Sequence, residues 1–480
     1  MQNKKILITG GAGYIGSHTN ALLNALRLQT LVVDNLSLGH KESLQYLPLN
    51  FFSNPMQKEI NLTQNLNKIN FQNRLNISDM QSRALNFLSK LAKDFNGGGG
   101  GQTQYSNLNN YSKINSKNSA PRKVSKNPIC NFETLADKST SNKIKDASSL
   151  QPQYDKILES KNPNRINSNQ DYSSYNIESS LKQPFSHLMP SSLQNTHKNT
   201  TFIHADLCDK TALDSIFTSH NIIAVIHFAA FAYVGESVSE PSKYYRNNIA
   251  NTLNLLESMR AHNVRHIIFS STCATYGNPL SLPITESHPQ NPINPYGYTK
   301  LVVENMLQDF ARAYSLNYVI LRYFNAAGAS MLFDLGESHE PETHLIPLLL
   351  QTALGQRACL SVFGDDYESR DGSCVRDYIH IDDLASAHIL ALKHLLNGGG
   401  SEVFNLSNGE GFSVFELIKC AEKLCGKKIP YRVEKRRAGD PATLIGDSTK
   451  AREILGWKPH FYDIETILKS ALRWHTNPRY

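Results

Sequence analysis

The 480-residue sequence predicts an α/β fold in which a parallel β-sheet carries helices on both faces. Three observations predict it: short apolar runs recur along the chain, stretches of helical spacing separate them, and a glycine turn joins the first run to the first helix. Strands that are apolar throughout are typical of parallel sheets buried on both faces. The pattern occupies about residues 1–50 and 200–325, and a long segment of different composition separates these regions.

The first 50 residues contain the start of the sheet. The apolar run Lys4–Thr9 predicts a strand, and the glycine turn Gly10–Gly16 follows it. Ser17–Arg27 has the leucine spacing of a helix, and Thr30–Asp34 predicts a second buried strand. A strand, glycine turn, helix and strand in this order predict a doubly wound sheet of the Rossmann type.

Residues 51–199 form an insert with 24 Asn, 22 Ser and the run Gly97–Gly101. This composition buries too little apolar surface to offset conformational entropy, so we expect the insert to be mostly disordered. Met80–Phe95 is an exception, because its leucines and aromatic residues predict an amphipathic helix that docks on the body or on a partner. Loop-closure entropy grows slowly with length, so we expect the chain to keep its function without residues 52–198.

The α/β pattern resumes at Thr201. The next predicted strands are Thr201–Ala205, Ile222–Ala229, His266–Ser270 and Tyr318–Arg322. Residues 326–480 are richer in loops, and we expect them to form a smaller substrate-binding lobe over the carboxyl edge of the sheet. The sheet domain is predicted to comprise residues 1–50 and 200–325, with part of 376–397 packed on it.

Composition argues against several classes of protein. The net charge of +7 does not indicate a nucleic-acid partner, because residues 51–200 hold 19 Lys and Arg against 10 Asp and Glu, which leaves 30 and 32 elsewhere. The seven cysteines form no CxxC pair, so neither a metal site nor a disulfide framework is expected. With no signal peptide and no apolar stretch of membrane-spanning length, we expect a cytoplasmic protein without a membrane partner.

The glycine turn predicts a dinucleotide site. Gly10, Gly13 and Gly16 permit a tight turn and let the backbone approach a pyrophosphate at the helix N-terminus, where free N–H groups favour anions. Asp34 ends the next strand, 18 residues past Gly16. Its carboxylate can accept hydrogen bonds from ribose hydroxyls and would repel a 2′-phosphate, which favours NAD over NADP.

Tyr296 and Lys300 form a candidate acid–base pair. They stand four residues apart at the start of a predicted helix and therefore share a face. Lowering a tyrosine pKa from about 10 to near 7 takes about 4 kcal/mol, which an ammonium group and a positive nicotinamide ring can supply. The same spacing also occurs by chance on surface helices. Thr272, near the end of an upstream strand, offers a hydroxyl for the oxygen that loses its proton.

Together these segments resemble the extended short-chain dehydrogenase/reductase family, and within it the UDP-glucose 4-epimerases. The motifs that carry the resemblance are TGGAGYIGSH, VDNLS, HFAAFAYVGESV, YYRNN, FSSTCATYG, PYGYTK, LRYFNAAGA, VFGDDY, DGSCVRDYIH and RRAGD. They cover about residues 1–50 and 200–475. The resemblance implies an NAD-dependent isomerase of carbohydrate metabolism that interconverts UDP-glucose and UDP-galactose.

The resemblance also implies roles for individual residues. Tyr296 is implied to be the catalytic base, Lys300 its partner on the nicotinamide ribose, and Thr272 the hydroxyl that positions the sugar. The implied NAD-binding residues are Gly10, Gly13, Tyr14, Ile15, Gly16, Asp34, Asn35, Asp206, Leu207, Phe228, Ala229, Ala230, Asn247, Lys300 and Phe324. The implied UDP-sugar-binding residues are Thr272, Tyr296, Asn325, Arg376, Arg437 and Asp440. The implied reaction passes through a 4-keto sugar, with transient transfer of the C4 hydride to NAD.

Three other functions are compatible with the fold that this resemblance implies. Sugar-nucleotide dehydratases and decarboxylases place carboxylates just after the corresponding threonine, whereas Cys273 and Ala274 follow Thr272 here. A non-catalytic NAD-binding protein would lack one of the three catalytic residues, and all three are present. The substrate stays open between UDP-hexoses, UDP-N-acetylhexosamines and UDP-pentoses, because Leu444 is intermediate in size at the position that gates the sugar, and His344 replaces an Asn of some relatives.

Relatives pair through the helix that carries the tyrosine and lysine, so the resemblance implies a homodimer. Four apolar residues could extend that face or belong to the core: Leu301, Val302, Val303 and Met306.

Overall fold

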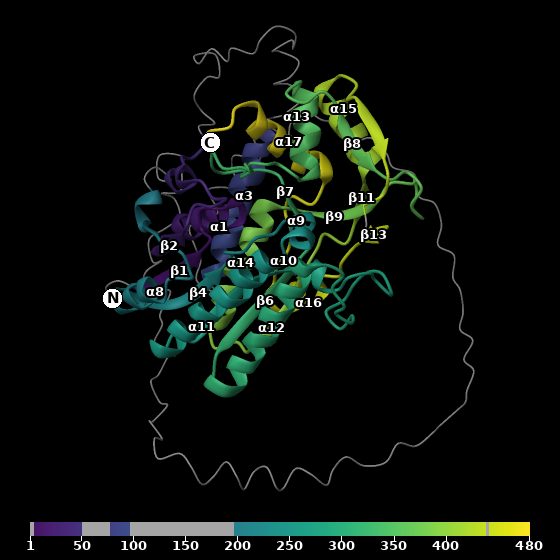
Figure 1. Cartoon of the computed structure of the whole chain (residues 1–480). Coiled ribbons are helices and arrows are strands. Elements are labelled where there is room, and N and C mark those ends of the chain that lie inside the picture. Colours follow the sequence, from purple (N-terminus) through teal and green to yellow (C-terminus); the bar gives the residue numbers. More distant parts are fainter. Residues whose placement is uncertain (1–3, 50–76, 97–195, 438–440) are drawn as a thin grey trace, which may run out of the picture. The chain divides into compact units, whose positions relative to one another are not determined.

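The structure is a computed structural model that describes residues 4–49, 77–96, 196–437 and 441–480. Its centre is a seven-stranded parallel sheet with the strand order β10-β6-β5-β4-β1-β2-β3 (Figure 1). The strands are β1 (Lys4–Thr9), β2 (Thr30–Asp34), β3 (Thr200–His204), β4 (Asn221–His227), β5 (His266–Thr272), β6 (Asn317–Tyr323) and β10 (Glu402–Leu406). The order reverses between β1 and β4, which makes a crevice at their carboxyl ends the expected ligand position.

Helices cover both faces of this sheet, as the sequence predicts. Successive side chains of a strand point to opposite faces, so Ile6 and Ile8 of β1 join one apolar core and Leu7 joins the other. The first core is built with α1 (Tyr14–Ala25) and α14 (Ile381–Leu396), and the second with α8 (Lys210–Ser219), α11 (Asn251–Ala261) and α12 (Pro295–Tyr314). The prediction of a doubly wound α/β fold is therefore confirmed.

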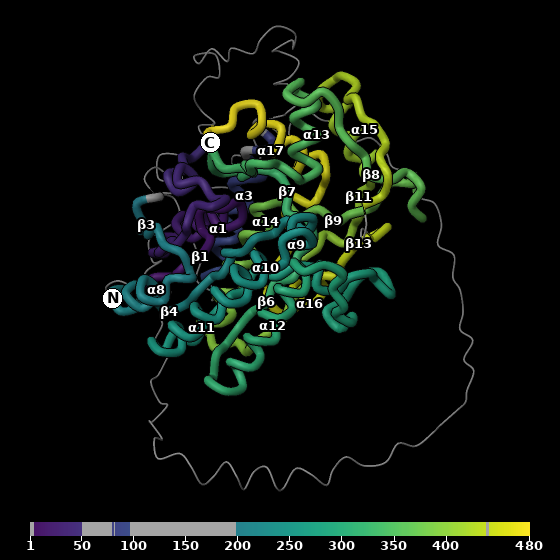
Figure 2. The backbone as a smooth tube through the Cα atoms, viewed as in Figure 1, coloured from purple at the N-terminus to yellow at the C-terminus, as the bar shows by residue number. Residues whose placement is uncertain are grey.

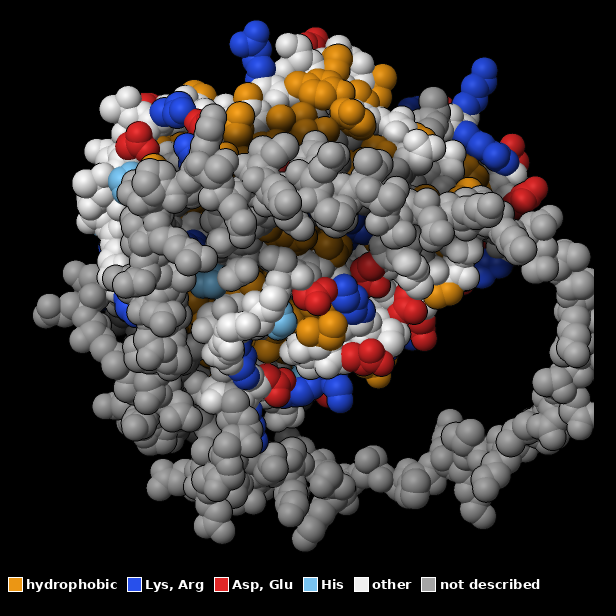
Figure 3. All heavy atoms as spheres, turned by 90° about the horizontal axis from the view of Figure 1, so that it is seen from below, with side chains coloured by type: hydrophobic (Ala, Val, Ile, Leu, Met, Phe, Trp, Pro, Cys, Tyr) orange, Lys and Arg blue, Asp and Glu red, His pale blue; other side chains and the backbone are white. Residues whose placement is uncertain are grey.

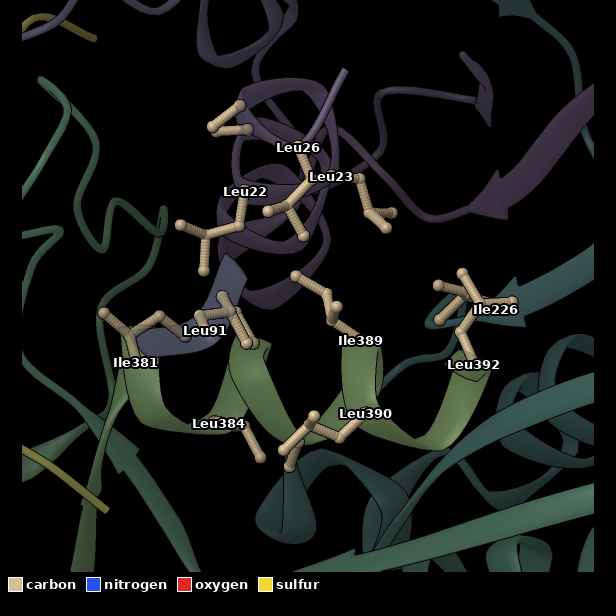
Figure 4. Close-up of a cluster of buried hydrophobic side chains, with 14 of the residues drawn as sticks. Leu22, Leu23, Leu26, Leu91, Ile226, Ile381, Leu384, Ile389, Leu390 and Leu392 are labelled. Carbon is tan, nitrogen blue, oxygen red and sulfur yellow. The ribbon is translucent and has the colours of Figure 1, made fainter. Parts of the chain in front are cut away.

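The helix predicted within the insert is present and docks on the sheet domain. It is α3 (Ile77–Asn96), and its buried residues recur every three or four positions: Met80, Ala84, Phe87, Leu88, Leu91, Ala92 and Phe95. Leu91 lies among side chains of α1 and α14 (Figure 4). Arg83 binds Asp463, the N-cap residue of α17 (Ile464–Thr476), at 3.0 Å. The remaining residues between 50 and 195, on which the prediction of disorder falls, lie outside the described residues.

The C-terminal part of the chain builds a smaller lobe (Figure 2). Its helices α13 (Leu345–Leu354), α15 (Val414–Cys425) and α17 pack around a separate apolar cluster. Its strands are β7 (Asn325–Ala327), β8 (Leu360–Phe363), β9 (Val375–His380), β11 (Gly411–Ser413), β12 (Tyr431–Glu434) and β13 (Thr443–Leu444). The chain also returns to the large sheet here, because α14 packs on it and β10 pairs with β6. The domain division itself stays a prediction.

The other helices of the described residues are short. They are η1 (Lys41–Gln45), η7 (Thr196–Asn199), α9 (Val234–Ser239), α10 (Pro241–Tyr244), the π-helix η8 (Tyr245–Ala250), η9 (Cys273–Thr275) and α16 (Thr449–Ile454). Across the described ranges, no helix combines the length and apolar character needed to cross a membrane. On the face seen from below, acidic and basic side chains of the described residues lie next to one another (Figure 3).

Candidate active site

The glycine turn between β1 and α1 leaves its backbone open at one position. A Cβ atom on Gly10, whose φ is +72°, would lie 2.5 Å from the backbone nitrogen of Ala229, and one on Gly16 would lie 2.3 Å from the Gly10 carbonyl oxygen. At Gly13 a Cβ atom would meet only that same oxygen, at 3.5 Å. Helix α1 has neither a side-chain cap nor an acidic residue in its first turn. Its N-terminal N–H groups and dipole therefore favour an anion beside Gly13.

Two carboxylates lie at the ends of the neighbouring strands. Asp34 accepts hydrogen bonds from the backbone N–H groups of Ala12 at 2.9 Å and Leu36 at 2.8 Å, which orient its carboxylate beside the turn. Burial raises the pKa of Asp34, and these two N–H donors oppose the shift. Asn35 donates its side-chain amide to Asp206 at 2.6 Å and so joins the ends of β2 and β3. Acceptor sites on both carboxylates remain for hydroxyl donors of a ligand.

The other residues predicted to bind the cofactor follow the same edge of the sheet. Tyr14 donates its hydroxyl to the carbonyl oxygen of Gly328 at 2.7 Å, which links α1 to the chain after β7. The backbone nitrogens of Phe228 and Ala229 donate to Thr9, and Ala230 follows them in the loop after β4. Four further predicted residues are Ile15 in α1, Leu207 after β3, Asn247 in the π-helix η8 and Phe324 after β6.

The candidate catalytic residues come together where β5 ends and α12 begins. Thr272 is the last residue of β5, and Tyr296 is the second residue of α12. The Asn294 side chain caps the helix by accepting from the Gly297 nitrogen at 2.8 Å. A Cβ atom on Gly297 would lie 2.5 Å from the carbonyl oxygen of Ala274, so glycine here lets the helix start lie close to the loop after Thr272.

The protonation of Tyr296 is set by opposing effects. Burial raises the pKa of Tyr296 above its ordinary value, and Tyr323 raises it further, whereas a hydrogen bond with Thr272 lowers it. Burial lowers the pKa of Lys300 to about 7, and the Glu304 carboxylate opposes that shift. Lys300 Nζ donates to the Ser270 carbonyl oxygen at 2.8 Å and lies 6.0 Å from the centre of the Tyr296 ring. The hydrogen bond to Ser270 therefore fixes the Lys300 ammonium group on β5, near the Tyr296 ring.

A buried ion pair behind these residues was missed by the sequence analysis. Glu304 lies one turn after Lys300 on α12, and its Oε2 atom is 2.5 Å from Nη2 of Arg322 on β6. Both side chains are almost fully buried. Ser271, next to Thr272 on β5, donates to the same carboxylate at 2.5 Å. This pair fixes α12 against β5 and β6. In the sequence, the i, i+4 spacing of Lys300 and Glu304 was the only sign that Glu304 shares the face of α12 that carries Lys300.

Three of the residues predicted to bind the sugar nucleotide belong to the C-terminal part of the chain that the structure describes: Asn325, Arg376 and Arg437. Asn325 donates to the Asp377 carbonyl oxygen at 2.9 Å, which places β7 beside β9. Arg376 on β9 is the register partner of Leu444 on β13. Leu444 packs against the cluster of Cys273, Tyr276, Ile284 and Phe324 next to Thr272. Arg437 is exposed, with its guanidinium 3.9 Å from the centre of the Phe363 ring. Asp440 lies outside the described residues.

Comparison with known proteins identifies the family. The family model described as GDP-mannose 4,6 dehydratase matches residues 168–471. The chain is 54% identical to a UDP-glucose 4-epimerase of Halalkalibacterium halodurans over 277 residues, which are 58% of this chain and 83% of the relative. It is 49% identical to that of Streptococcus mutans over 282 residues, 58% of this chain and 85% of the relative. The chain belongs to the UDP-glucose 4-epimerase family.

Solved structures agree with this assignment. The fold is similar to a UDP-glucose 4-epimerase from Brucella ovis in complex with NAD, with a TM-score of 0.63 and 33% identity over 98% of both chains. It is also similar to the enzyme from Bifidobacterium longum in complex with NAD⁺ and UDP, with a TM-score of 0.63 and 28% identity over 99% of both chains. The resemblance expected from the sequence motifs is therefore confirmed.

The matching family model is named for a dehydratase, but the loop after Thr272 lacks the groups expected for that reaction. Cys273 and Ala274 follow Thr272, as the sequence shows. Burial raises the pKa of Cys273 to about 12, so its thiol stays protonated near neutral pH. Neither residue can act as a carboxylate acid or base at this position.

Proposed function

We propose that the chain is an NAD-dependent UDP-glucose 4-epimerase that interconverts UDP-glucose and UDP-galactose. One observation carries the proposal: Thr272, Tyr296 and Lys300 lie together at the same edge of the sheet as an uncapped glycine turn. The homologous epimerases, about half identical to the chain, support the choice of reaction.

The residues at the turn fit NAD. The open backbone at Gly13 and the uncapped start of α1 suit the pyrophosphate, and the Asp34 carboxylate suits the hydroxyls of the adenosine ribose. We expect Lys300, whose Nζ lies 6.0 Å from the centre of the Tyr296 ring, to bind the second ribose. When bound, NAD supplies the acceptor and donor for the hydrogen at C4 of the sugar.

The chain's own residues then manage the proton and the orientation of the sugar. Tyr296, as the phenolate, takes the proton of the 4-hydroxyl when the C4 hydrogen leaves and gives it back when that hydrogen returns. Thr272 hydrogen-bonds the same oxygen and the phenol. Arg376 and Arg437 hold the diphosphate, so the 4-keto sugar can turn about this tether and present its other face. The low exposure of Tyr296 keeps water away from the reacting atoms.

The proposal includes a homodimer in the cytoplasm. Three large side chains on the outer side of η8, α11 and α12 are exposed: Tyr245, Leu253 and Tyr298. The Tyr245 and Tyr298 ring centres are 6.3 Å apart. Of the residues considered for this face, Val303 lies in the core and Met306 packs against it, whereas Leu301 and Val302 stay half-buried. Exposed aromatic and leucine side chains grouped together favour a protein contact.

The test is to incubate purified protein with UDP-galactose and to separate the nucleotide sugars by chromatography. UDP-glucose is expected to accumulate to equilibrium. Tyr296→Phe is expected to lower kcat on the order of 100- to 10,000-fold, because the base is removed. Tyr314→Phe, an exposed tyrosine at the far end of the same helix, should leave kcat unchanged. No conversion by the wild type would overturn the proposal, and UDP-N-acetylgalactosamine and UDP-xylose in parallel define the accepted sugar.

A further inference from the structure

Two glutamates and two histidines converge on one point in the segment between β7 and α13. They are Glu337, His339, Glu342 and His344, and each offers one ligand atom within 4.8 Å of all the others. The segment lies beside the crevice, since the His339 ring is 6.4 Å from the ring of Tyr14 and 6.3 Å from that of Tyr233. None of the four has a role in the proposed reaction.

The distances between these atoms are near the edge lengths of a zinc coordination tetrahedron. Zinc bonds of about 2.0–2.2 Å to nitrogen or oxygen place neighbouring ligand atoms about 3.3–3.6 Å apart. His344 Nδ1 lies 2.8 Å from Glu337 Oε1 and 3.2 Å from Glu342 Oε1. His339 Nδ1 lies 3.4 Å from Glu337 Oε1 and 3.7 Å from Glu342 Oε2. One of these four distances lies within that range, and small side-chain shifts would bring the other three to it.

Hydrogen bonding alone does not satisfy this cluster. His339 Nδ1 is buried and makes no hydrogen bond, although two carboxylates face it. The Glu337 and Glu342 side chains are only 4% and 7% exposed, and two buried negative charges need positive partners. A divalent cation bound by both carboxylates and both imidazoles would balance these charges.

The backbone around the cluster orients its ligands. Glu342 Oε1 accepts from the backbone nitrogens of Thr343 and His344, both at 2.8 Å. The Trp474 side chain of α17 donates to the Glu337 carbonyl oxygen at 2.9 Å. Tyr233 donates its hydroxyl to the Pro341 carbonyl oxygen at 3.4 Å. Such contacts fix the direction of metal ligands in established sites.

We propose that Glu337, His339, Glu342 and His344 form a structural divalent-metal site, selective for Zn²⁺, that holds this segment beside the crevice. Imidazole with carboxylate ligands suits zinc, and four protein ligands close the tetrahedron and leave no position for substrate. The metal anchors the segment that joins the sheet domain to α13. It takes no part in the chemistry at Tyr296, so the site and the proposed reaction stand or fall separately.

The test measures metal in the purified full-length protein by mass spectrometry, after removal of any affinity tag. About one zinc per chain is expected. After removal of the metal with a chelator, titration with ZnCl₂ against a zinc-binding dye should restore one tight site and raise Tm. His339→Gln and Glu342→Gln are each expected to weaken binding on the order of 100-fold or more. His394→Gln, in the last turn of α14, is the matched control and should bind as the wild type does.

The proposal would be overturned if the wild-type protein holds no zinc and, after chelation, binds added zinc no more tightly than His339→Gln does. In that case the four residues form a hydrogen-bonded ion-pair cluster only. The chelation arm uses wild-type protein, so the proposal stays testable if a variant fails to fold. Zinc binding with equal affinity in both glutamine variants would also contradict it, because the metal would then bind elsewhere.

Discussion

The reactivity proposed for Tyr296 depends on the charges around a phenol that is almost completely shielded from water. Burial raises the pKa of Tyr296, so the phenolate needs compensating interactions before it can take a proton. Thr272 supplies a hydrogen bond, and Lys300 supplies a positive charge when it is protonated. Ser270 fixes the position of that charge through its carbonyl oxygen.

Replacing Lys300 with methionine is expected to move the pH profile of kcat to higher pH. Removal of the positive charge raises the pKa of Tyr296, so a smaller fraction is phenolate at any given pH, and activity rises only at higher pH. The measurement is kcat from about pH 5 to 10 for the wild type and the variant. A profile that falls in height without moving would contradict a role for Lys300 in setting this pKa.

The positions of the residues proposed to carry the chemistry were largely predictable from the sequence, because spacing alone places Tyr296 and Lys300 on one face and Gly10, Gly13 and Gly16 in one turn. The Glu304–Arg322 pair could not be predicted, because it depends on how α12 packs on β6. The proposed zinc ligands have a regular spacing, E-x-H-x-x-E-x-H from Glu337 to His344, but a search guided by cysteine pairs does not find it.

Helix α12 is held on the sheet by the Glu304–Arg322 pair, and this is the element on which Tyr296 depends. Glu304→Gln is expected to cost about 3–5 kcal/mol of unfolding free energy, because it leaves a buried guanidinium without its counter-charge. Glu257→Gln is the matched control, since its pair with Lys210 is exposed and is expected to contribute about 0–1 kcal/mol. Denaturant titration gives both values. Equal losses of unfolding free energy in the two variants would contradict the claim that burial makes the Glu304–Arg322 pair more stabilising than an exposed pair.

Helix α3 is a part of the insert on which the fold depends. Phe87 is buried against Phe461, with ring centres 5.2 Å apart. Phe87→Ala is therefore expected to cost about 3–5 kcal/mol and to lower Tm by several degrees, while kcat per folded molecule stays unchanged. Asn86→Ala, at the exposed neighbouring position, should not lower Tm. The two variants melting together would show that α3 does not dock on the body.

This docking changes the expectation for deletion of residues 52–198. The deletion would remove the buried side chains of α3 as well as the Asn- and Ser-rich sequence, so we now expect it to destabilise the protein. Element boundaries moved less: α1 begins at Tyr14 and not at Ser17, because the turn ends at Gly13, and β5 extends to Thr272. The helical spacing of Met80–Phe95 was sufficient to predict α3, but sequence spacing cannot identify the surface on which a helix docks.

At the scale of the whole molecule, the C-terminal part of the chain packs beside the carboxyl edge of the sheet, since Leu444 lies against the cluster that contains Cys273 and Phe324. The order of apolar runs was sufficient to predict the sheet and its glycine turn. The return of β10 to the edge beside β6 was not predicted, because Glu402–Leu406 follows a long excursion into the lobe and its partner is far away in sequence.

The homodimer is expected to depend on the exposed residues of α11 and α12. Leu253→Glu should place a charge in the contact and convert the protein to a monomer of 53.7 kDa, whereas the wild type should have twice that mass. Size-exclusion chromatography with light scattering measures both. Leu280→Glu, at another exposed leucine outside these helices, is the control. A wild type that is monomeric would contradict the dimer.

In the proposed reaction, the hydrogen at C4 of the sugar leaves and returns to the opposite face of the same carbon. The most direct test is to convert UDP-galactose labelled with deuterium at C4 in ordinary water and to locate the label by NMR and mass spectrometry. We expect UDP-glucose that keeps its deuterium at C4, because only the hydroxyl proton passes to Tyr296. Loss of the deuterium to water, or its appearance at another carbon, would contradict it.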